Sequence, residues 1–395
     1  MSAPRLVLVT RRFWPLVGGA EIMMANLMAG FRDRGVETTL LTARWQADWP
    51  PEVVHRGGRV IRLPQPSLRG WGTFQYMRSL QRWLQAHADE FDLAYVSMLK
   101  HDAYAAIGGG RKAGFPVVLR VEGAGLTGDV HWQLNARFGA SIRRRCQHAA
   151  ALVAPSEAVE RELIAAGYPR GKIHRISNAV PISPRRSPRA RLDARLSLAT
   201  TDRALAIEHD DPLVIYTGRL HAAKGLTRLV AAWPAVLARH RQARLWLVGE
   251  GPLRDVLREQ IDAASLGGRV ILTGAFDQVD GLLAAADVFV LPSHQEGLSV
   301  SLLEAMASGL PVVATDIPGN RQLVGDNQCG LLVPLEDDPQ PLAGAIVRLL
   351  DDAAMSSKLA AHARQRVESH FALDTMVDVH LDLFDRILKT SPRER

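Results

Sequence analysis

Two glutamates flank the start of one predicted helix. Glu296 and Glu304 stand eight residues apart in a run that begins Pro-Ser-His-Gln-Glu-Gly and ends Leu-Pro-Val-Val-Ala-Thr. The run predicts a buried strand over 287–291, a loop that holds Glu296, and a helix over 299–308 that holds Glu304. The backbone N–H groups of 298–301 are free donors that attract an anion. Carboxylates beside such a helix start suit a ligand with phosphates and hydroxyls, such as a nucleotide sugar, although the helix dipole alone also favours glutamates there.

Two cations follow the first predicted strand of the second half. Arg219 and Lys224 stand five residues apart, after an apolar run over 213–217 and between glycines. Open α/β sheets bind ligands at the carboxyl ends of their strands, and paired cations there can grip a diphosphate without a metal. The alternative is a pair of solvated surface cations.

Glycine-rich turns follow several other predicted strands. Gly18 and Gly19 separate the first strand from the first helix, so the backbone there can approach a ligand closely, or simply make a tight turn. Gly249 follows another strand in Val-Gly-Glu-Gly-Pro, which carries Arg254 where a dinucleotide fingerprint has its last glycine. That departure argues against an NAD site.

Length and composition indicate a globular α/β chain of two domains. Its 395 residues exceed one ordinary core, and strand and helix signals alternate in both halves, which predicts parallel sheets. We expect an N-terminal domain over 1–182, a second domain over 183–370 and a final helical segment over 371–395 that packs back on the first domain. The two cysteines exclude a disulfide framework and favour a reducing cytoplasm. The first apolar run is a strand, and no run approaches the ~20 residues of a membrane-spanning helix.

The charge is concentrated in the first half. Residues 1–190 hold 27 Lys and Arg against 14 Asp and Glu, and the remainder is net acidic within a total of +7. Such a basic half implies an anionic partner: a membrane surface, a lipid pyrophosphate, an acidic saccharide or nucleic acid. No nucleic-acid-binding motif is present, so we expect no nucleic acid. Aromatics and cations alternate between residues 44 and 83, which suits a membrane interface, although core aromatics beside solvated arginines would give the same pattern.

The whole run from Pro292 to Thr315 resembles the donor-binding signature of the retaining, GT-B-fold glycosyltransferases of family 4, and the resemblance is strongest over 213–337. It implies two Rossmann-like domains that face each other across a cleft. It also implies a hexosyltransferase that moves a sugar from a UDP-, GDP- or ADP-sugar to a hydroxyl of a glycan or lipid-linked saccharide, with retained configuration and without a metal or other cofactor. The enzyme would work in the cytoplasm or peripherally on the inner face of the membrane.

The resemblance also assigns roles to residues of the second half. Arg219 and Lys224 would stabilise the departing diphosphate, Glu296 would bind donor-sugar hydroxyls, and Glu304 would bind the ribose. Further donor contacts are expected from the turns and the helix start, namely Gly18, Gly19, Gly249, Phe276, Gly297, Leu298, Ser299 and Val300.

The N-terminal half departs from the family pattern. Many relatives carry a histidine after the strand that corresponds to 117–121, where this chain has Glu122. Glu122 could orient a sugar hydroxyl or stabilise positive charge at the reacting carbon, or it could only pair with Arg120. We assign His101, Asp102 and Arg120 to the acceptor side. A sugar-nucleotide epimerase or phosphorylase on the same fold, and a non-catalytic nucleotide-sugar-binding homologue, remain as alternatives.

Overall fold

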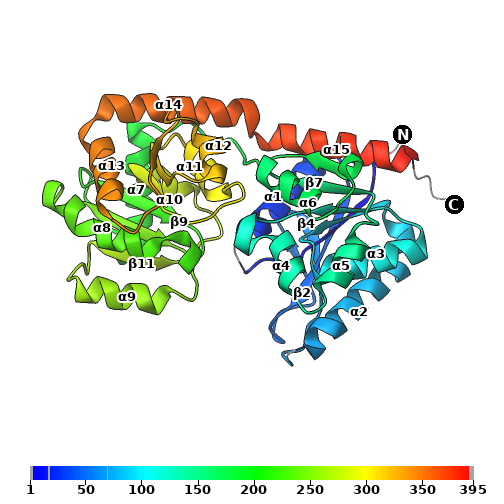
Figure 1. Ribbon diagram of the computed structural model, residues 1–395. Helices are drawn as coiled ribbons and strands as arrows, with labels where there is room; N and C mark the ends of the chain where they lie inside the picture. Colours follow the sequence, from blue (N-terminus) through cyan, green and yellow to red (C-terminus); the bar gives the residue numbers. More distant parts are fainter. Residues whose placement is uncertain (1–2, 17, 69, 391–395) are drawn as a thin grey trace. The chain divides into compact units, whose positions relative to one another are not determined.

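The computed structural model describes residues 3–16, 18–68 and 70–390 (Figure 1). The chain forms two compact units, of which unit 1 comprises Met1–Asn178 with Leu373–Arg395 and unit 2 comprises Ala179–Ala372. The sequence placed these boundaries at 182 and 370. Each unit is a mostly parallel sheet with helices on both faces, so the predicted α/β class with two Rossmann-like domains is confirmed.

Unit 1 contains an eight-stranded sheet in the order β3-β4-β2-β1-β5-β6-β7-β8. All neighbouring strands pair in parallel except β3 with β4, which form an antiparallel hairpin at one edge. The central strands are short apolar runs buried on both sides, as crossover connections require. The strands are β1 (Leu6–Val9), β2 (Thr38–Arg44), β3 (Glu52–His55), β4 (Gly58–Pro64), β5 (Leu93–Ser97), β6 (Val117–Arg120), β7 (Ala151–Ala154) and β8 (Ile173–Arg175).

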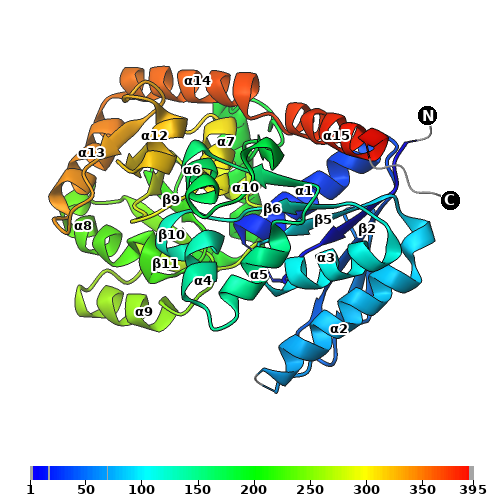
Figure 2. The same ribbon diagram turned by 45° about the vertical axis from the view of Figure 1, so that its right-hand side comes forward.

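The helices of unit 1 divide between the two faces of its sheet. On one face α2, α3 and α5 lie side by side over a shared apolar core, with α4 beside α5 (Figure 2). On the other face α1 packs against α15. The helices are α1 (Gly19–Asp33), α2 (Trp71–Ala86), α3 (His101–Ala113), α4 (Asp129–Asn135), α5 (Gly139–Cys146), α6 (Glu157–Ala165) and α15 (Leu373–Thr390), with 3-10 turns η1 (Ala88–Glu90), η2 (Gly125–Thr127) and η3 (Arg170–Lys172).

The C-terminal helix α15 belongs to the packing of unit 1. A Cβ on Gly30 of α1 would lie 2.4 Å from Val377, so the glycine permits the close approach of the two helices. On the buried side of α15, His380 donates from Nδ1 to the carbonyl of Met376, and its Nε2 lies 2.9 Å from the hydroxyl of Tyr95 on β5. The hydrophobic face of α15 therefore completes the core on this side of the sheet.

Unit 2 contains a six-stranded sheet in the order β11-β10-β9-β12-β13-β14, with every neighbouring pair parallel. Its strands are β9 (Leu213–Thr217), β10 (Arg244–Val248), β11 (Val270–Gly274), β12 (Val288–Leu291), β13 (Val312–Thr315) and β14 (Leu331–Val333). Its helices are α7 (Pro188–Thr201), α8 (Leu226–Arg239), α9 (Arg254–Ala263), α10 (Asp280–Ala285), α11 (Val300–Ala307), α12 (Pro318–Val324), α13 (Gln340–Asp351) and α14 (Ala353–His370), with 3-10 turns η4 (Arg203–Leu205) and η5 (Ala222–Lys224).

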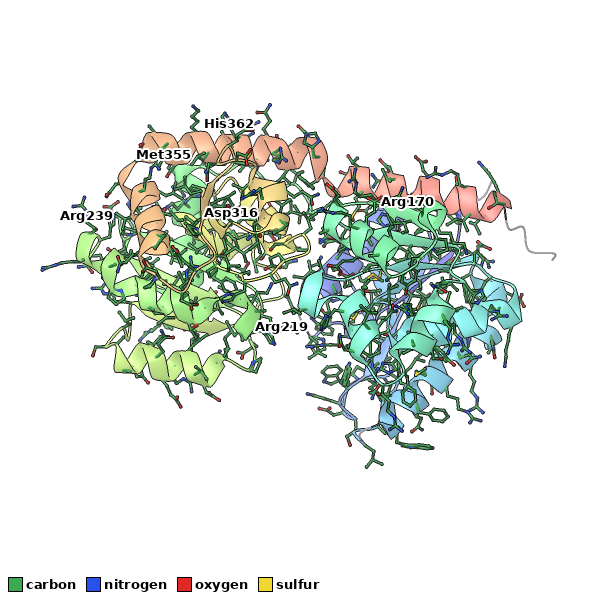
Figure 3. The ribbon with its side chains drawn as sticks, in the orientation of Figure 1. Arg170, Arg219, Arg239, Asp316, Met355 and His362 are labelled. Atoms are coloured by element: carbon green, nitrogen blue, oxygen red, sulfur yellow. The ribbon has the colours of Figure 1, made fainter. Side chains whose placement is uncertain are left out.

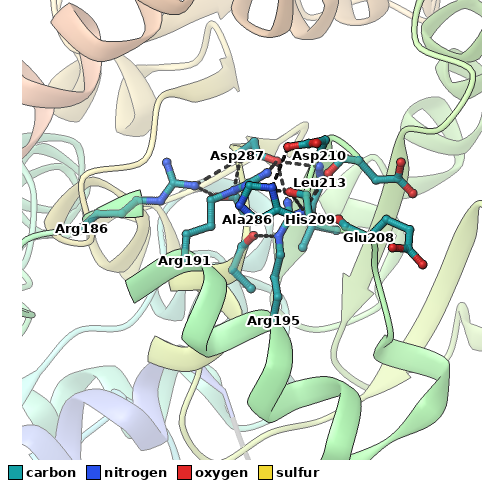
Figure 4. Close-up of polar contacts among 11 residues, drawn as sticks. Arg186, Arg191, Arg195, Glu208, His209, Asp210, Leu213, Ala286 and Asp287 are labelled. Atoms are coloured by element: carbon teal, nitrogen blue, oxygen red, sulfur yellow. Dashed lines mark hydrogen bonds and ion pairs between the residues drawn. The ribbon is translucent and has the colours of Figure 1, made fainter. Parts of the chain in front are cut away.

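Asp287, at the start of β12, fastens the segment over 183–211 that precedes β9. The segment forms α7, which packs on α10, and three of its arginines converge on this carboxylate (Figure 4). Arg191 and Arg195 contact Asp287 at 2.7 and 2.9 Å, and Arg186 at 3.3 Å. Asp287 also accepts from the N–H of Leu213. The carboxylate thereby joins α7 to two central strands of unit 2.

The stretch between residues 44 and 83 is where the sequence was least informative. It folds into the end of β2, the β3–β4 hairpin and α2, none of which the periodicity had separated. Both interpretations of its aromatics apply in part, since Tyr76 is fully buried whereas Trp45, Trp71 and Phe74 are exposed.

Candidate active site

The strand order of each sheet creates a point where neighbouring connections leave in opposite directions. In unit 2 this switch point lies between β9 and β12, and in unit 1 between β1 and β5. Ligands of open α/β sheets bind outside the carboxyl ends of the strands at such points. The loop after β9 carries Arg219 and Lys224, and the loop after β12 carries Glu296. The predicted catalytic residues of unit 2 therefore follow the two strands at its switch point.

Lys224 and Glu296 form an ion pair between these two loops. Lys224 Nζ lies 2.6 Å from Glu296 Oε1, and the side chains are 23% and 9% exposed. The fully buried hydroxyl of Ser293 donates to the same oxygen at 2.7 Å. The Glu296 carboxylate is therefore held in one orientation, while the Lys224 side chain remains partly accessible.

The two loops are also locked together through their backbones. The N–H of His294 donates to the carbonyl of Ala223 at 2.9 Å. Gly225 has a positive φ of 63°, and a Cβ there would lie 2.1 Å from the carbonyl oxygen of Pro292. No side chain fits at that position, so the glycine after Lys224 is required for the close approach that brings the pair together.

The start of α11 supplies backbone donors beside this pair. The helix begins at Val300, one residue later than predicted, and Ser299 is its N-cap. Ser299 Oγ accepts from the N–H of Leu302 at 3.3 Å. In the described part of the chain, the N–H groups of Val300 and Ser301 have no acceptor. Two free donors thus remain at the positive end of the helix dipole.

Neighbouring segments support this loop and helix. A Cβ on Gly319, at the start of α12, would lie 2.6 Å from the carbonyl oxygen of Glu296 and 2.9 Å from that of Gly297, so α12 packs directly on the loop backbone. Leu298 is buried beneath the loop. Glu304 lies one turn into α11 and is half-buried.

Arg219 is an exposed residue in the loop after β9 (Figure 3). Its carbonyl accepts from the hydroxyl of the buried Tyr216 at 3.0 Å, which fixes the backbone and leaves the guanidinium at the surface. Gly249, after β10, is packed so closely that a Cβ would lie 1.9 Å from the carbonyl oxygen of Gly218. Its role is therefore to let the loops after β9 and β10 touch. Phe276, beyond β11, is half-buried.

In unit 1 the loop after β1 is anchored by residues that the sequence did not single out. Gly18 is the N-cap of α1 and Gly19 its first residue. Just before them, Trp14 stacks on His55 of β3 with ring centroids 5.3 Å apart. Arg62 of β4 donates to the carbonyl of Trp14 at 3.0 Å. The β3–β4 hairpin thus fixes the entry to the glycine turn.

Glu122 follows β6 and is held in a buried polar network. Its Oε1 accepts from Arg120 Nε at 2.7 Å and from Ser97 Oγ at 3.1 Å, and the side chain is 16% exposed. Arg120 is completely buried and also donates to Asn178. The N–H of Glu122 donates to Asp129. The pairing with Arg120 is thus present, and it leaves one edge of the carboxylate at the surface.

His101 and Asp102, the first residues of α3, differ in their exposure. Asp102 is buried, and this burial raises the pKa of its carboxyl to about 6. His101 is half-buried and lies edge-on to Trp132 with centroids 5.2 Å apart. Burial, together with the charges of Arg11 and Lys100, lowers the pKa of His101 to about 4. His101 is therefore neutral near pH 7, and of this pair only it can touch a ligand directly. Asp102 and Arg120 are both buried, so each is limited to an indirect role.

Three polar residues to which the sequence had assigned no role support the predicted site residues, although Ser293 lies within the run from Pro292 to Thr315. The hydroxyls of Ser293 and Ser97 donate hydrogen bonds to the carboxylates of Glu296 and Glu122, respectively. Asp129 accepts from the N–H groups of Leu99 and Glu122. Ser97 ends β5 and Ser293 lies two residues beyond β12. The available signal was a polar residue at the carboxyl end of an apolar strand, which is too common to select these residues by itself.

Metal-binding clusters and membrane-spanning helices are both absent from the part of the chain that the structure describes. Its residues contain no group of three or more His, Cys, Asp or Glu side chains that could hold a metal ion. Among the same residues no helix is long and apolar enough to cross a membrane.

Two family models match successive parts of the chain. Residues 18–179 match the glycosyl transferase 4-like domain, and residues 211–352 match glycosyl transferases group 1. Over most of its length the chain is 29% identical to the 2-deoxystreptamine N-acetyl-D-glucosaminyltransferase of Streptomyces fradiae, covering 92% of this chain and 90% of that enzyme. It is also 29% identical to the GDP-mannose-dependent alpha-mannosyltransferase of Mycobacterium tuberculosis, covering 89% of each. The 32% identity to the alpha-D-kanosaminyltransferase of Streptomyces kanamyceticus spans 43% of this chain and 44% of that enzyme.

Solved structures share the fold over nearly the whole chain. Sucrose-phosphate synthase from Thermosynechococcus elongatus matches with a TM-score of 0.79 and 23% identity, covering 98% of this chain and all of that one. The Anabaena protein HepE, in complex with UDP and glucose, matches with a TM-score of 0.78 and 22% identity, covering 97% and 99%.

Proposed function

Because the chain belongs to the group 1 glycosyltransferases with the GT-B fold, we propose that it transfers a sugar, as a hexosyltransferase, from a nucleotide diphosphate donor to a hydroxyl of a glycan or lipid-linked saccharide. The observation that carries the proposal is the Lys224–Glu296 pair at the switch point of unit 2, next to the free N–H groups of Val300 and Ser301. The donor class is supported by relatives that use GDP-mannose or were solved with UDP.

The residues of unit 2 divide the donor between them. As the bond to the sugar breaks, negative charge grows on the departing diphosphate, and Arg219 and Lys224 stabilise it together with the helix start. Glu296, held by Ser293, binds hydroxyls of the donor sugar, and Glu304 binds the ribose. Carboxylates accept hydrogen bonds from hydroxyls and repel phosphates, so each type of side chain selects its part of the ligand.

The residues of unit 1 serve the acceptor side in this proposal. Neutral His101 can donate to or accept from a hydroxyl, and the accessible edge of Glu122 can orient one or offset positive charge at the reacting carbon. Arg120 and Asp102 act from within, by holding Glu122 and the start of α3. Retention of configuration follows from the family resemblance and is part of the proposal.

Two cations beside a helix start make a divalent metal unnecessary for neutralising the diphosphate. We therefore propose that turnover is independent of a metal. We also propose that the enzyme works in the cytoplasm, with peripheral attachment to a membrane. Turnover that survives chelation by EDTA is expected, and its abolition, with recovery on adding Mg²⁺, would refute metal independence.

The proposed function is tested by ligand binding and by turnover. Thermal shifts measured with UDP, GDP, ADP and their sugars should single out one nucleotide, because a ligand that binds the folded state stabilises it. If none shifts the transition, the donor site is wrong. Donor consumption that requires an acceptor identifies a transferase, whereas conversion of the donor alone identifies an epimerase. Binding without turnover on any saccharide acceptor would identify a non-catalytic homologue.

A further inference from the structure

Four neighbouring helices on one face of the sheet of unit 1 carry exposed charge of one sign. Helices α2, α3, α4 and α5 lie next to one another on this face (Figure 2). Their cations are Arg78, Arg82, Arg111, Lys112, Arg143, Arg144 and Arg145. Their acidic residues are Asp102 and Asp129, and both are buried. The charge that these four helices present to solvent is therefore entirely positive, whereas α6, which packs into the same core, carries Glu157, Glu160 and Glu162 against Arg161.

The exposed cations of α2, α3 and α5 have no ion-pair partner in the described part of the chain. Arg78, Arg82, Arg111, Lys112 and Arg144 are exposed. None of them takes part in an ion pair among the residues that the structure describes. We call the exposed surface of α2, α3 and α5 the basic face. The next acidic residues along the chain after α2, Asp89 and Glu90 in η1, lie at the opposite edge of the sheet from the candidate site, whereas Glu162 of α6 accepts from the N–H of Gly125 in η2.

The other face of the same sheet has the opposite character. Helices α1 and α15 carry six acidic residues against three basic ones, namely Glu21, Asp33, Asp374, Asp378, Asp382 and Asp385 against Arg32, Arg386 and Lys389. Among the helices of unit 1, the positive charge is therefore concentrated on α2, α3 and α5, which a general need for solubility does not explain.

Exposed apolar side chains mark two ends of the basic face. At the start of α2, Trp71 and Phe74 are 57% and 52% exposed, and their ring centroids lie 5.7 Å apart. Around α4, Leu126, Leu134 and Phe138 are 75%, 61% and 62% exposed. We call these two groups the apolar tips. Large apolar side chains with this exposure usually mark an interaction surface when they gather in one place.

Both apolar tips lie at the edge of the sheet that carries the acceptor-side residues. Helix α2 follows the carboxyl end of β4, and η2 with α4 follows that of β6. His101 follows β5 and Glu122 follows β6, at the same edge. A surface that touched the tips would therefore come close to the proposed acceptor residues.

We propose that the basic face and its apolar tips bind an anionic lipid surface, and that the acceptor is a lipid-linked saccharide presented there. This inference rests on the proposed function. Cations near an anionic leaflet are attracted to its headgroups, and Trp, Phe and Leu insert at the boundary between headgroups and acyl chains. A soluble polyanion would be held by the cations alone and would give the exposed tips no favourable environment. The tips would place the lipid headgroup beside His101 and Glu122.

The charge contribution is tested by co-sedimentation of the full chain with vesicles of phosphatidylcholine, with and without phosphatidylglycerol. The wild-type chain should bind only the anionic vesicles and dissociate as salt is raised. The double variant Arg78→Glu/Arg82→Glu should bind at least about 25-fold more weakly, since each surface cation contributes about fivefold. The matched control Arg241→Glu/Arg258→Glu makes the same charge change at exposed positions of unit 2 and should bind like wild type.

The apolar contribution needs a separate variant. Trp71→Ser/Phe74→Ser should weaken vesicle binding about tenfold or more at unchanged net charge, because binding scales with buried apolar area. Its control is Leu196→Ser/Val256→Ser, which removes two exposed apolar side chains from unit 2 and should have no effect. Loss of binding in the charge variant without loss in the Trp71/Phe74 variant would mean a purely electrostatic contact and would overturn the role of the tips.

Donor binding separates this inference from the proposed function. Each variant should keep the wild-type thermal shift with the preferred nucleotide, which also shows that it is folded. Absence of wild-type binding to anionic vesicles, with an intact nucleotide shift, overturns the membrane inference alone. Absence of any nucleotide shift overturns the proposed function. Equal turnover on a water-soluble saccharide and on its lipid-linked form in anionic vesicles would overturn the lipid-linked acceptor.

Discussion

Replacing Lys224 with Met tests the central assignment of unit 2. Methionine keeps the length and the apolar body of the side chain and removes only the charged donor. In the structure that donor lies 2.6 Å from Glu296 Oε1, and the remaining donor to this oxygen is the hydroxyl of Ser293. The substitution therefore removes one cation from the proposed diphosphate site and loosens the carboxylate that it orients.

The expected effect on turnover is larger than the effect on stability. A hydrogen bond to a charged group contributes about 1.5–3 kcal/mol, and the pair is partly exposed on the lysine side, so a stability loss near the lower value is expected. Removing a group that stabilises charge in the transition state typically lowers kcat by about 10²–10³, or about 2.7–4 kcal/mol. Lys224→Met should therefore remain folded and lose about 10²–10³ in kcat.

A double-mutant cycle with Glu296→Gln distinguishes the two roles of Lys224. If the lysine binds the diphosphate itself, Lys224→Met also weakens the binding of the free nucleoside diphosphate, which calorimetry measures, whereas Glu296→Gln leaves that affinity nearly unchanged. In kcat/KM, the double variant should lose less than the sum of the single losses, because the pair is in contact. Lys358→Met, at an exposed position of α14, is the matched control.

Two results would refute this reasoning. Turnover of Lys224→Met within a few-fold of wild type would remove the leaving-group role. Equal losses in both single variants, with no further loss in the double variant and unchanged nucleotide affinity, would show that the lysine serves only to hold Glu296.

Further predictions concern the groups that hold each unit together. Asp287→Asn should lower the unfolding free energy of unit 2 by about 2–4 kcal/mol in urea titrations, because it leaves the buried guanidinium of Arg195 without its carboxylate; a loss under about 0.5 kcal/mol would contradict this. Arg62→Ala removes the hydrogen bond from Arg62 to the carbonyl of Trp14 and should lower kcat/KM for the donor about tenfold or more, with unchanged far-UV circular dichroism. Burial lowers the pKa of His380 to about 3. Between about pH 6.5 and 4, His380 is therefore protonated in the unfolded chain and neutral in the folded one. The free energy of unfolding should then fall with falling pH, by up to about 1.4 kcal/mol per pH unit. His380→Leu should flatten that dependence, and an unchanged pH slope would contradict its assignment to His380.

Local sequence patterns located most of the elements that carry the candidate site. The strand over Leu213–Thr217 has the predicted bounds, and the strand expected over 287–291 and the helix expected over 299–308 each end within one residue of the prediction. Short apolar runs ended by glycine or proline leave little choice of structure. The hairpin of β3 and β4 and helix α2 were missed because their apolar positions are interrupted by arginines and tryptophans, whose burial depends on distant partners.

The sequence by itself determined the types of the site residues and the loops in which they lie. Cations after one strand, a glutamate after another and a capped helix start are local features, written in neighbouring residues. Only the tertiary structure decided which of them meet: Lys224 reaches Glu296 across 72 residues because β9 and β12 are adjacent in the sheet and Gly225 leaves room for Pro292. It also decided that Glu122 pairs with the buried Arg120, and that the cations of α2, α3 and α5 share one face. Burial and adjacency depend on contacts between segments far apart in the chain, which no local pattern specifies.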